Sequence, residues 1–151
     1  METFEILVDY SKTLKEMIIE ALKKMVIVGR YDWKKDNVIS EDFSTKKEVV
    51  NVKFKLICLQ KRVSSEEILC YMEKDNLRQA TFLELLFFGI THPEIQLKFP
   101  IVALGTSWFD SEGLRRIPYL YGNYIRRCIN FNWFGYRWHK RYRFLAVCKV
   151  V

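Results

Sequence analysis

The stretch from residue 101 to residue 121, IVALGTSWFDSEGLRRIPYLY, places two apolar runs on either side of the polar segment 110–113. Such runs, rich in β-branched and aromatic residues and separated by a short turn, are typical of an antiparallel β-hairpin. We expect its strands over 101–109 and 114–121. The hairpin therefore predicts an antiparallel sheet in the C-terminal third of the chain.

Two further strands are predicted downstream of the hairpin. Ile129, Phe131 and Trp133 alternate with Asn130 and Asn132, which is the period-two pattern of a half-buried strand. A turn is expected over 134–136 and a closing strand over 143–151. The residues expected in the core here are Ile129, Phe131, Trp133, Phe144, Ala146 and Cys148. The order of these strands predicts a C-terminal meander.

The N-terminal part mixes helical and strand patterns. Apolar residues at three- and four-residue steps predict an amphipathic helix over 11–25, with Asp9 or Ser11 as its cap. A short strand is expected over 4–8, another near 38–39 within the polar segment 30–47, and a longer one over 48–63, where apolar and polar residues alternate.

Two more helices are predicted from their capping residues. Ser64 with Glu67 matches the capping box and predicts a helix to residue 74. A second box starts at Thr81 and predicts a helix to residue 88, with Gly89 as its stop. One further helical turn is expected to begin at Pro93.

Length and composition indicate one folded domain. A chain of 151 residues, half of them hydrophobic, is long enough to bury a single core. We expect one domain over 1–151, with a helix-rich part (1–98) and a β-meander (99–151). The predicted fold is α+β, with N-terminal helices packed on a mostly antiparallel sheet.

The composition changes after Glu112. Residues 113–151 contain no Asp or Glu, but hold seven of the ten arginines together with Lys140 and Lys149. The preceding residues nearly balance their charges, so the formal net charge of +7 comes from this segment. A local positive field attracts acidic partners and speeds association.

Tyrosine and asparagine are interleaved with these arginines, a composition typical of recognition surfaces. From Tyr119 to Arg137, only Trp133 lies outside the amino acids that an asparagine codon reaches by changes in its first two bases. The residues expected to bind a ligand are Tyr119, Tyr121, Asn123, Tyr124, Arg126, Asn130, Asn132, Phe134, Tyr136, His139 and Tyr142.

Several C-terminal segments resemble known proteins. FPIVALGTSW at 99–108, RRIPYL at 115–120, Asn132-Trp133, Trp138 and RFLAV at 143–147 resemble a group of uncharacterised bacterial proteins. They also resemble, more loosely, the end of C-type-lectin-fold variable proteins diversified by retroelements. That resemblance implies a C-type-lectin-like fold whose varied Tyr, Asn and His positions bind ligands without catalysis. The calcium-binding triplets of sugar-binding lectins are absent from the sequence, so calcium and carbohydrate are not implied, and Lys140 departs from the varied pattern.

The sequence offers little for catalysis or for a metal. The only histidines are His92 and His139, and no C-x-x-C or H-x-x-x-H spacing occurs. His92 is expected to be a cap or surface residue, and Asp110 and Glu112 to be exposed turn carboxylates. No phosphate-binding glycine motif is found. We therefore expect no enzyme activity, no cofactor and no metal.

The expected compartment is the cytoplasm. The N-terminus lacks the basic start and apolar stretch of a signal peptide, and the longest apolar run, 82–90, is too short to span a bilayer. The four scattered cysteines are expected to be free, mostly buried thiols in a reducing compartment.

Three functions fit these features. The first is recognition of an unknown protein or other macromolecule through the C-terminal segment. The second is nucleic-acid binding, in which arginines contact phosphates and aromatic rings stack on bases. The third is an interaction subunit whose aromatic residues form an oligomer interface. We rank them in that order.

Overall fold

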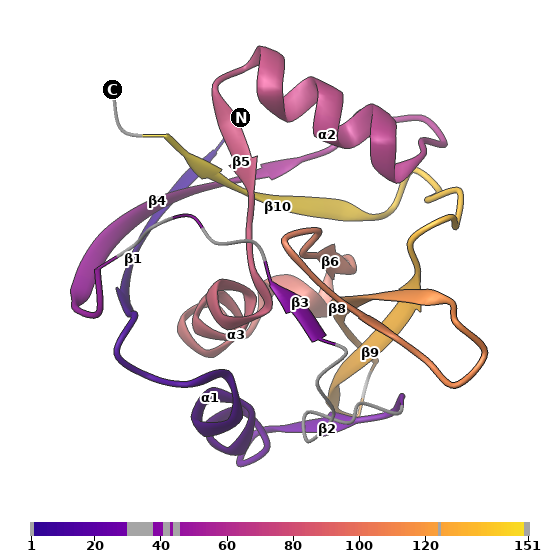
Figure 1. The fold of residues 1–151 in the computed structure, drawn as a ribbon. Helices are drawn as coiled ribbons and strands as arrows, with labels where there is room; N and C mark the ends of the chain where they lie inside the picture. Colours follow the sequence, from indigo (N-terminus) through magenta and orange to yellow (C-terminus); the bar gives the residue numbers. More distant parts are fainter. Residues whose placement is uncertain (1, 30–37, 41–42, 44–45, 124, 150–151) are drawn as a thin grey trace.

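The computed structural model describes residues 2–29, 38–40, 43, 46–123 and 125–149 (Figure 1). The helices of this part are α1 (Leu14–Ala21), α2 (Ser65–Lys74), α3 (Phe82–Thr91) and the 3-10 helix η1 (Ile95–Leu97). Its strands are β1 (Thr3–Asp9), β2 (Met25–Ile27), β3 (Val38–Ser40), β4 (Val49–Ile57), β5 (Leu77–Gln79), β6 (Ile101–Val102), β7 (Thr106–Phe109), β8 (Arg115–Gly122), β9 (Arg127–Trp133) and β10 (Arg143–Cys148).

These strands form one sheet with the order β1-β4-β10-β6-β8-β7-β3, to which β9 adds beside β8, β2 beside β9, and β5 beside β10. All pairings are antiparallel except β10 with β6 and β2 with β9. The predicted α+β class is confirmed, with a mixed sheet that is mostly antiparallel. None of the helices in the described part is long and apolar enough to span a membrane.

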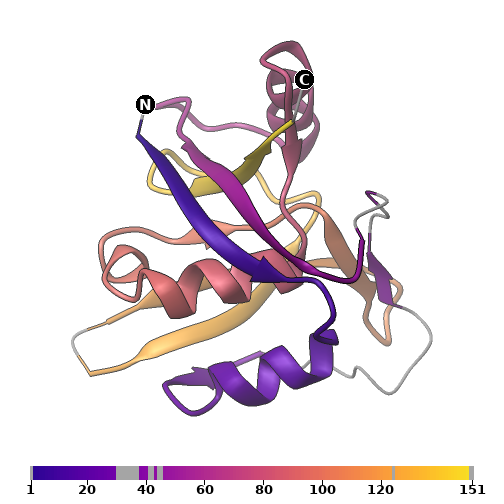
Figure 2. The ribbon, with the colours of Figure 1, turned by 90° about the vertical axis from the view of Figure 1, so that its left-hand side faces the viewer.

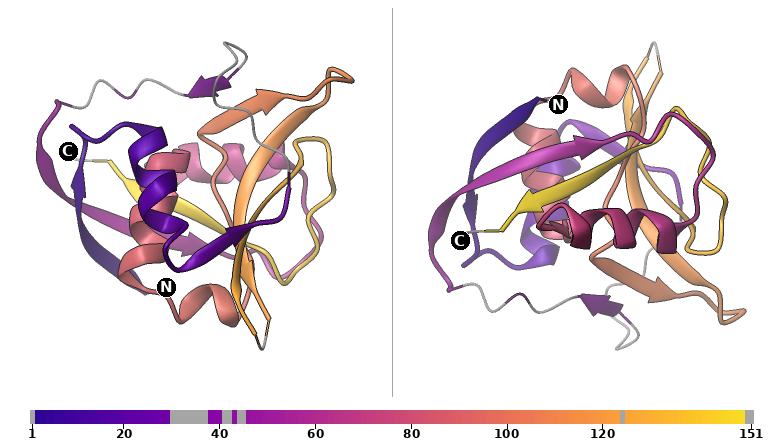
Figure 3. Two further views of the ribbon diagram at one scale, coloured as in Figure 1. Left: turned by 90° about the horizontal axis from the view of Figure 1, so that it is seen from below. Right: turned by 90° about the horizontal axis from the view of Figure 1, so that it is seen from above.

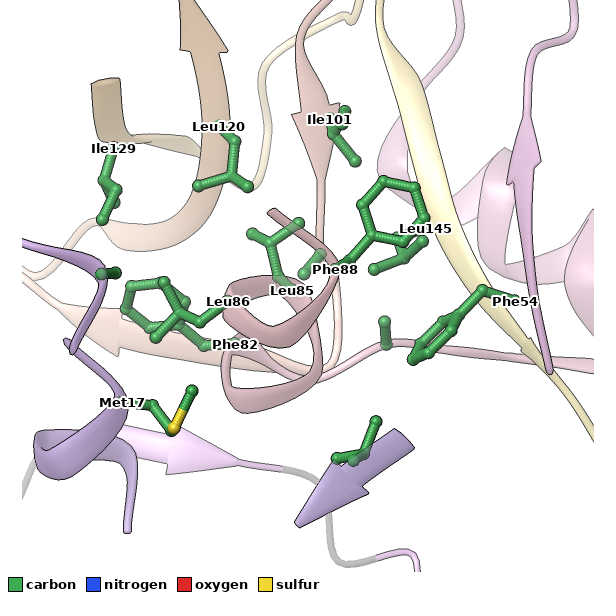
Figure 4. Packing of buried hydrophobic residues seen from close by; sticks show 14 of the residues in the cluster. Met17, Phe54, Phe82, Leu85, Leu86, Phe88, Ile101, Leu120, Ile129 and Leu145 are labelled. Atoms are coloured by element: carbon green, nitrogen blue, oxygen red, sulfur yellow. The ribbon is translucent and has the colours of Figure 1, made fainter. Parts of the chain in front are cut away.

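The sheet curves around α3, which lies on its inner side (Figure 1). Figure 2 shows β1 and β4 crossing in front of α3, with α1 along the lower side of the molecule. Phe82, Leu85, Leu86 and Phe88 of α3 are buried against residues of β4, β6, β8, β9 and β10 (Figure 4). Each such side chain stabilises the fold by about 1.5–3 kcal/mol.

A second core lies on the other side of the sheet, beneath α2. It is built around Ile68 and Met72 of α2, together with Val102, Ile117 and Trp138. Strand β10 contributes to both cores, because its successive side chains point to opposite faces: the pair Leu145 and Val147 faces α3, and the pair Phe144 and Ala146 faces the second core.

This two-sided burial explains why the last strand of the predicted meander takes a different place in the sheet. Strands β7, β8 and β9 are consecutive antiparallel neighbours, as the sequence indicated. Strand β10 does not follow β9 in the sheet, however, but lies between β4 and β6. A strand that is apolar on both faces is best buried at the centre of a sheet covered on both sides.

Each of the three α-helices in the described part begins with a capping box. Those at Ser64 and Thr81 were predicted, and the structure confirms them. The predicted cap of α1 at Asp9 or Ser11 is wrong, because Thr13 caps this helix: its Oγ1 accepts the N–H of Glu16 at 3.1 Å. Each such cap contributes about 1 kcal/mol.

Three helix ends differ from the prediction. Helix α1 stops at Ala21, and a turn over 22–24 leads into β2, which pairs with β9. Helix α3 continues through Gly89 to Thr91. A Cβ at position 89 would lie 2.5 Å from Leu120 Cδ1, so the glycine permits close packing of α3 on β8. The turn expected at Pro93 begins at Ile95 instead.

The strand predictions have the right places but several wrong bounds. Strand β4 ends at Ile57 and not near residue 63, and the predicted strand 101–109 is divided into β6 and β7. Strands β2 and β5 were not predicted. Among the expected core residues, Trp133 is exposed and Cys148 is only half-buried; each is the last residue of its strand.

A buried ionic group joins α3 to the sheet. Glu84, 1 % exposed, accepts two hydrogen bonds from the Arg78 guanidinium at 2.9 and 2.7 Å, and one from the Tyr10 hydroxyl at 2.5 Å. Burial alone would raise the pKa of Glu84, but the hydrogen bonds and charge of Arg78 outweigh it and hold that pKa below its ordinary value. Burial raises the pKa of Tyr10, so this hydroxyl stays a donor.

Candidate ligand-recognition surface

Strands β8 and β9 place tyrosine and asparagine side chains on one face of the sheet. Their register pairs Tyr119 with Asn130 and Tyr121 with Cys128. Leu120 lies between the two tyrosines and belongs to the core around α3. Since side chains alternate along a strand, the tyrosines face the opposite way, toward the side of the second core. The polar residue that follows on the same side of β9 is Asn132.

The loop between β9 and β10, residues 134–142, adds further rings to this face. The ring of Tyr142 lies 5.8 Å from Tyr119, 5.9 Å from Tyr136 and 4.7 Å from His139, all measured between ring centroids. Tyr119 stacks on Tyr121 at 5.5 Å, with 29° between the planes. The rings therefore form one continuous cluster. We call the following set the tyrosine face: Tyr119, Tyr121, Asn130, Asn132, Tyr136, His139 and Tyr142.

Trp138 fixes this loop to the rest of the molecule. Its side chain is 0 % exposed, and its Nε1–H donates to Ser65 Oγ at 2.9 Å. The Ser65 hydroxyl in turn donates to the Phe134 carbonyl at 2.6 Å. Backbone hydrogen bonds of 2.9 and 2.8 Å join Val63 and Trp138 in both directions. The loop thus runs beside the segment that precedes α2, as the two adjacent ribbons in Figure 3 show.

Seven of the eleven residues expected to bind a ligand belong to the tyrosine face. Six of these are half-buried, so each keeps part of its surface in solvent. Tyr142 is only 9 % exposed and lies against Tyr119, Tyr136 and Trp138. Its expected role as a ligand contact is therefore corrected to that of a support beneath the face.

The other four expected residues are not part of the tyrosine face. Asn123 and Arg126 lie at the turn between β8 and β9, where Asn123 Oδ1 accepts the backbone N–H groups of residues 125 and 126. Phe134 is covered by the Arg115 guanidinium, 4.0 Å above its ring. Tyr124 lies outside the described residues.

Burial favours the protonated form of three tyrosine hydroxyls here. It raises the pKa of Tyr119 and of Tyr121, and it raises that of Tyr142 to about 12. The nearby phenol groups of Tyr119 and Tyr136 add to the effect at Tyr142. The face therefore presents neutral hydroxyl and amide groups that can donate and accept hydrogen bonds.

Basic side chains surround the loop. Arg62 donates to the Arg137 carbonyl at 3.4 Å, and Arg141 donates to the Lys98 carbonyl at 3.1 Å, so three separate segments meet here. Arg137 also lies 3.8 Å from the exposed carboxylate of Glu67, a contact that contributes little in solvent. We call the following residues the basic rim: Lys61, Arg62, Lys98, Arg137, Lys140 and Arg141.

A pocket of about 250 Å³ lies where the tyrosine face meets the basic rim. Tyr121 and His139 line it from the tyrosine face, and Lys98 and Arg141 from the basic rim. Its remaining lining residues are Gln96, Leu97, Phe99, Pro100 and Gly122. Lys98 was not expected at the site, because it lies far from the Tyr/Arg segment in the sequence. The arginine-rich composition drew attention to Arg141 but did not place it.

The residues set aside as structural have structural partners. His92 ends α3, with its ring 5.2 Å from that of Phe4. Asp110 accepts the backbone N–H groups of Glu112 and Leu114, each at 2.9 Å, and the Arg116 guanidinium at 3.0 Å, so it holds the hairpin turn. No group of His, Cys, Asp or Glu with the arrangement of a metal site occurs within the described residues.

Comparisons with known proteins gave no match to a protein-family model, to a curated protein or to a solved structure. The resemblance to C-type-lectin-fold variable proteins therefore stays a prediction.

The arrangement of side chains is suited to binding. Neutral donors and acceptors lie on a stiff sheet, and cations stand at its border. The tyrosine face itself contains a single imidazole, His139, and no carboxylate to orient it. It offers aromatic area and directional hydrogen bonds, which are the elements of a recognition surface.

Proposed function

We propose that this chain is a non-enzymatic ligand-recognition protein that binds a macromolecular partner through the tyrosine face. The observation that carries the proposal is the convergence of β8, β9 and the loop 134–142 on one continuous ring cluster. These residues are spread over two strands and a loop, and Tyr119 and Tyr136 pack against the second core while keeping part of their surface in solvent.

The physical basis of recognition is preorganisation. Tyrosine contributes a large contact area while only two side-chain torsions are fixed on binding. Here the rings already contact one another, and Trp138 holds the loop in place, so little conformational entropy remains to be lost. A few central side chains are expected to dominate affinity, at about 2 kcal/mol or more each on truncation.

We further propose that the face is diversified among close relatives, as the lectin-like resemblance implies. The positions that would vary are the tyrosine and asparagine residues of the face, whereas buried Trp138 and Phe144 would stay fixed. This pattern can be checked in a set of closely related sequences, where uniform divergence along the chain would contradict it. A reducing cytoplasm as the compartment is part of the same proposal.

Affinity capture tests the proposed function. The immobilised full chain is incubated with extract of the source organism, in parallel with the variant Asn132→Ala/Tyr136→Ala and the control Leu7→Ala/Lys53→Ala, whose side chains are exposed on the paired strands β1 and β4. We expect a partner that wild type and control retain and the face variant loses. Equal retention by all three chains, or by none, contradicts the proposal. Circular dichroism verifies that each variant is folded.

A further inference from the structure

We propose that the pocket between the tyrosine face and the basic rim binds a backbone phosphate of a single-stranded nucleic acid, with an adjacent base against Tyr121. This inference rests on the proposed function, because it names the partner of the same face. It adds a phosphate subsite built from Lys98, His139 and Arg141, of which Lys98 and Arg141 are not among the eleven residues expected to bind a ligand.

The charge of the pocket selects an anion. Lys98 and Arg141 line it, and neither forms an ion pair with a carboxylate of the described residues. His139 Nδ1 accepts the backbone N–H of Arg141 at 3.3 Å, which leaves Nε2 as the N–H donor of the neutral ring. The pocket therefore offers an ammonium, a guanidinium and a ring N–H, and no carboxylate lines it.

The floor of the pocket is fixed by Gln96, which is buried. Its Nε2 donates to the Tyr121 carbonyl at 2.9 Å and to the Cys128 carbonyl at 3.4 Å. The amide thus joins η1 to β8 and β9, and it holds Lys98, two residues further along the chain, opposite Arg141. The Arg141 guanidinium is itself held at this wall of the pocket by its hydrogen bond to the Lys98 backbone carbonyl.

An aromatic platform adjoins these cations. Tyr121 lines the pocket and stacks on Tyr119, so the ring surface continues from the anion subsite onto the tyrosine face. An anionic group next to a planar ring is the repeating chemistry of a polynucleotide. Stacking of a base on an aromatic side chain contributes about 1–3 kcal/mol and tolerates any base.

The basic rim favours a polyanion over a small anion. Its residues follow the loops on from the pocket, from Arg141 and Lys140 to Arg137 and Arg62, so that successive phosphates of one strand would meet successive cations. A single strand fits better than a duplex, because the base faces that Tyr121 requires are covered by neighbours in a duplex.

Fluorescence anisotropy with labelled oligo-dT and oligo-rU of about twelve nucleotides tests this inference on the full chain. We expect both probes to bind at low salt, and Lys98→Ala and Arg141→Ala each to weaken binding by about fivefold or more. Each loss should lower the slope of log affinity against log salt by about 0.7. Tyr121→Ala should weaken binding by about fivefold or more, and Tyr121→Phe should retain it.

Lys15→Ala and Lys53→Ala are the matched controls, since both remove an exposed lysine outside the rim. The inference is overturned if neither probe binds, if the controls weaken binding as much as Lys98→Ala, or if a duplex of the same length binds equally well. These failures are distinct from failure of the proposed function. If the tyrosine face captures a protein and the capture persists after nuclease treatment, the nucleic-acid partner is overturned and the recognition face remains.

Discussion

Replacement of Trp138 by alanine should destabilise the protein strongly, whereas the same replacement at Trp133 should not. The two residues have the same side chain and lie five positions apart, at the end of β9 and in the loop that follows. Trp138 is 0 % exposed, contacts the rings of Tyr136, Tyr142 and Phe144, and donates to Ser65. Trp133 is 46 % exposed.

The expected magnitudes follow from these surroundings. Truncation of a buried Trp costs about 3–5 kcal/mol, a large fraction of the 5–15 kcal/mol that typically stabilises a domain. Trp138→Phe keeps most of the ring contacts but loses the hydrogen bond to Ser65, so we expect about 1–2 kcal/mol. Trp133→Ala should cost about 1 kcal/mol or less.

The assay is urea denaturation followed by far-ultraviolet circular dichroism, which reports mainly on backbone secondary structure. The free energy of unfolding should fall in the order wild type, Trp133→Ala, Trp138→Phe, Trp138→Ala, at an unchanged denaturant slope. An equal loss for Trp133→Ala and Trp138→Ala would refute the claim that Trp138 anchors the loop beneath the tyrosine face.

Three further predictions concern other parts of the fold. Glu84→Gln should lower the free energy of unfolding by about 3–5 kcal/mol, because it leaves Arg78 without its carboxylate. The wild type should also lose stability as the pH falls through the lowered pKa of Glu84. Denaturation curves measured at a series of pH values should show this loss for the wild type and not for the variant. Folding raises the pKa of Tyr142 from 10.0 to about 12, so the protonated hydroxyl contributes stability that is fully present below pH 10 and is lost as the pH rises toward 12. In Tyr142→Phe the free energy of unfolding should therefore depend less on pH over that range. Gly113→Ala should lower the free energy of unfolding by about 1–2 kcal/mol, measured by thermal unfolding, because φ is +81° at this position. The added Cβ contacts nothing, so the backbone conformation alone accounts for the loss, and an unchanged stability would contradict the left-handed turn.

Local chemistry explains which elements could be predicted from the sequence. The capping boxes at Ser64 and Thr81 and the hairpin of β7 and β8 depend on residues close in the chain, and all three are confirmed. The short strands β2 and β5 depend on pairing with β9 and β10, which no local pattern reveals. Glycine is common at helix ends, so Gly89 was predicted as a stop, yet its role is to allow close contact with Leu120 of a distant strand.

The candidate site divides in the same way. Alternation along 129–133 indicated that Asn130 and Asn132 lie opposite Ile129 and Phe131, but the pairing of Tyr119 with Asn130 comes from the register of β8 and β9. The burial of Tyr142 and the position of Lys98 arise from the loop 134–142 folding back over the sheet and from its contact with η1. Composition indicated the recognition segment, but only the tertiary structure brings it to a pocket.

Site-specific photocrosslinking in extract of the source organism tests the recognition face most directly. A photoreactive phenylalanine analogue replaces Tyr121, Tyr136 or, as the control on β4, Lys53. Crosslinks to a common partner should form from positions 121 and 136 and be absent at 53. Crosslinks from position 53 alone, or equally from all three, would contradict the account.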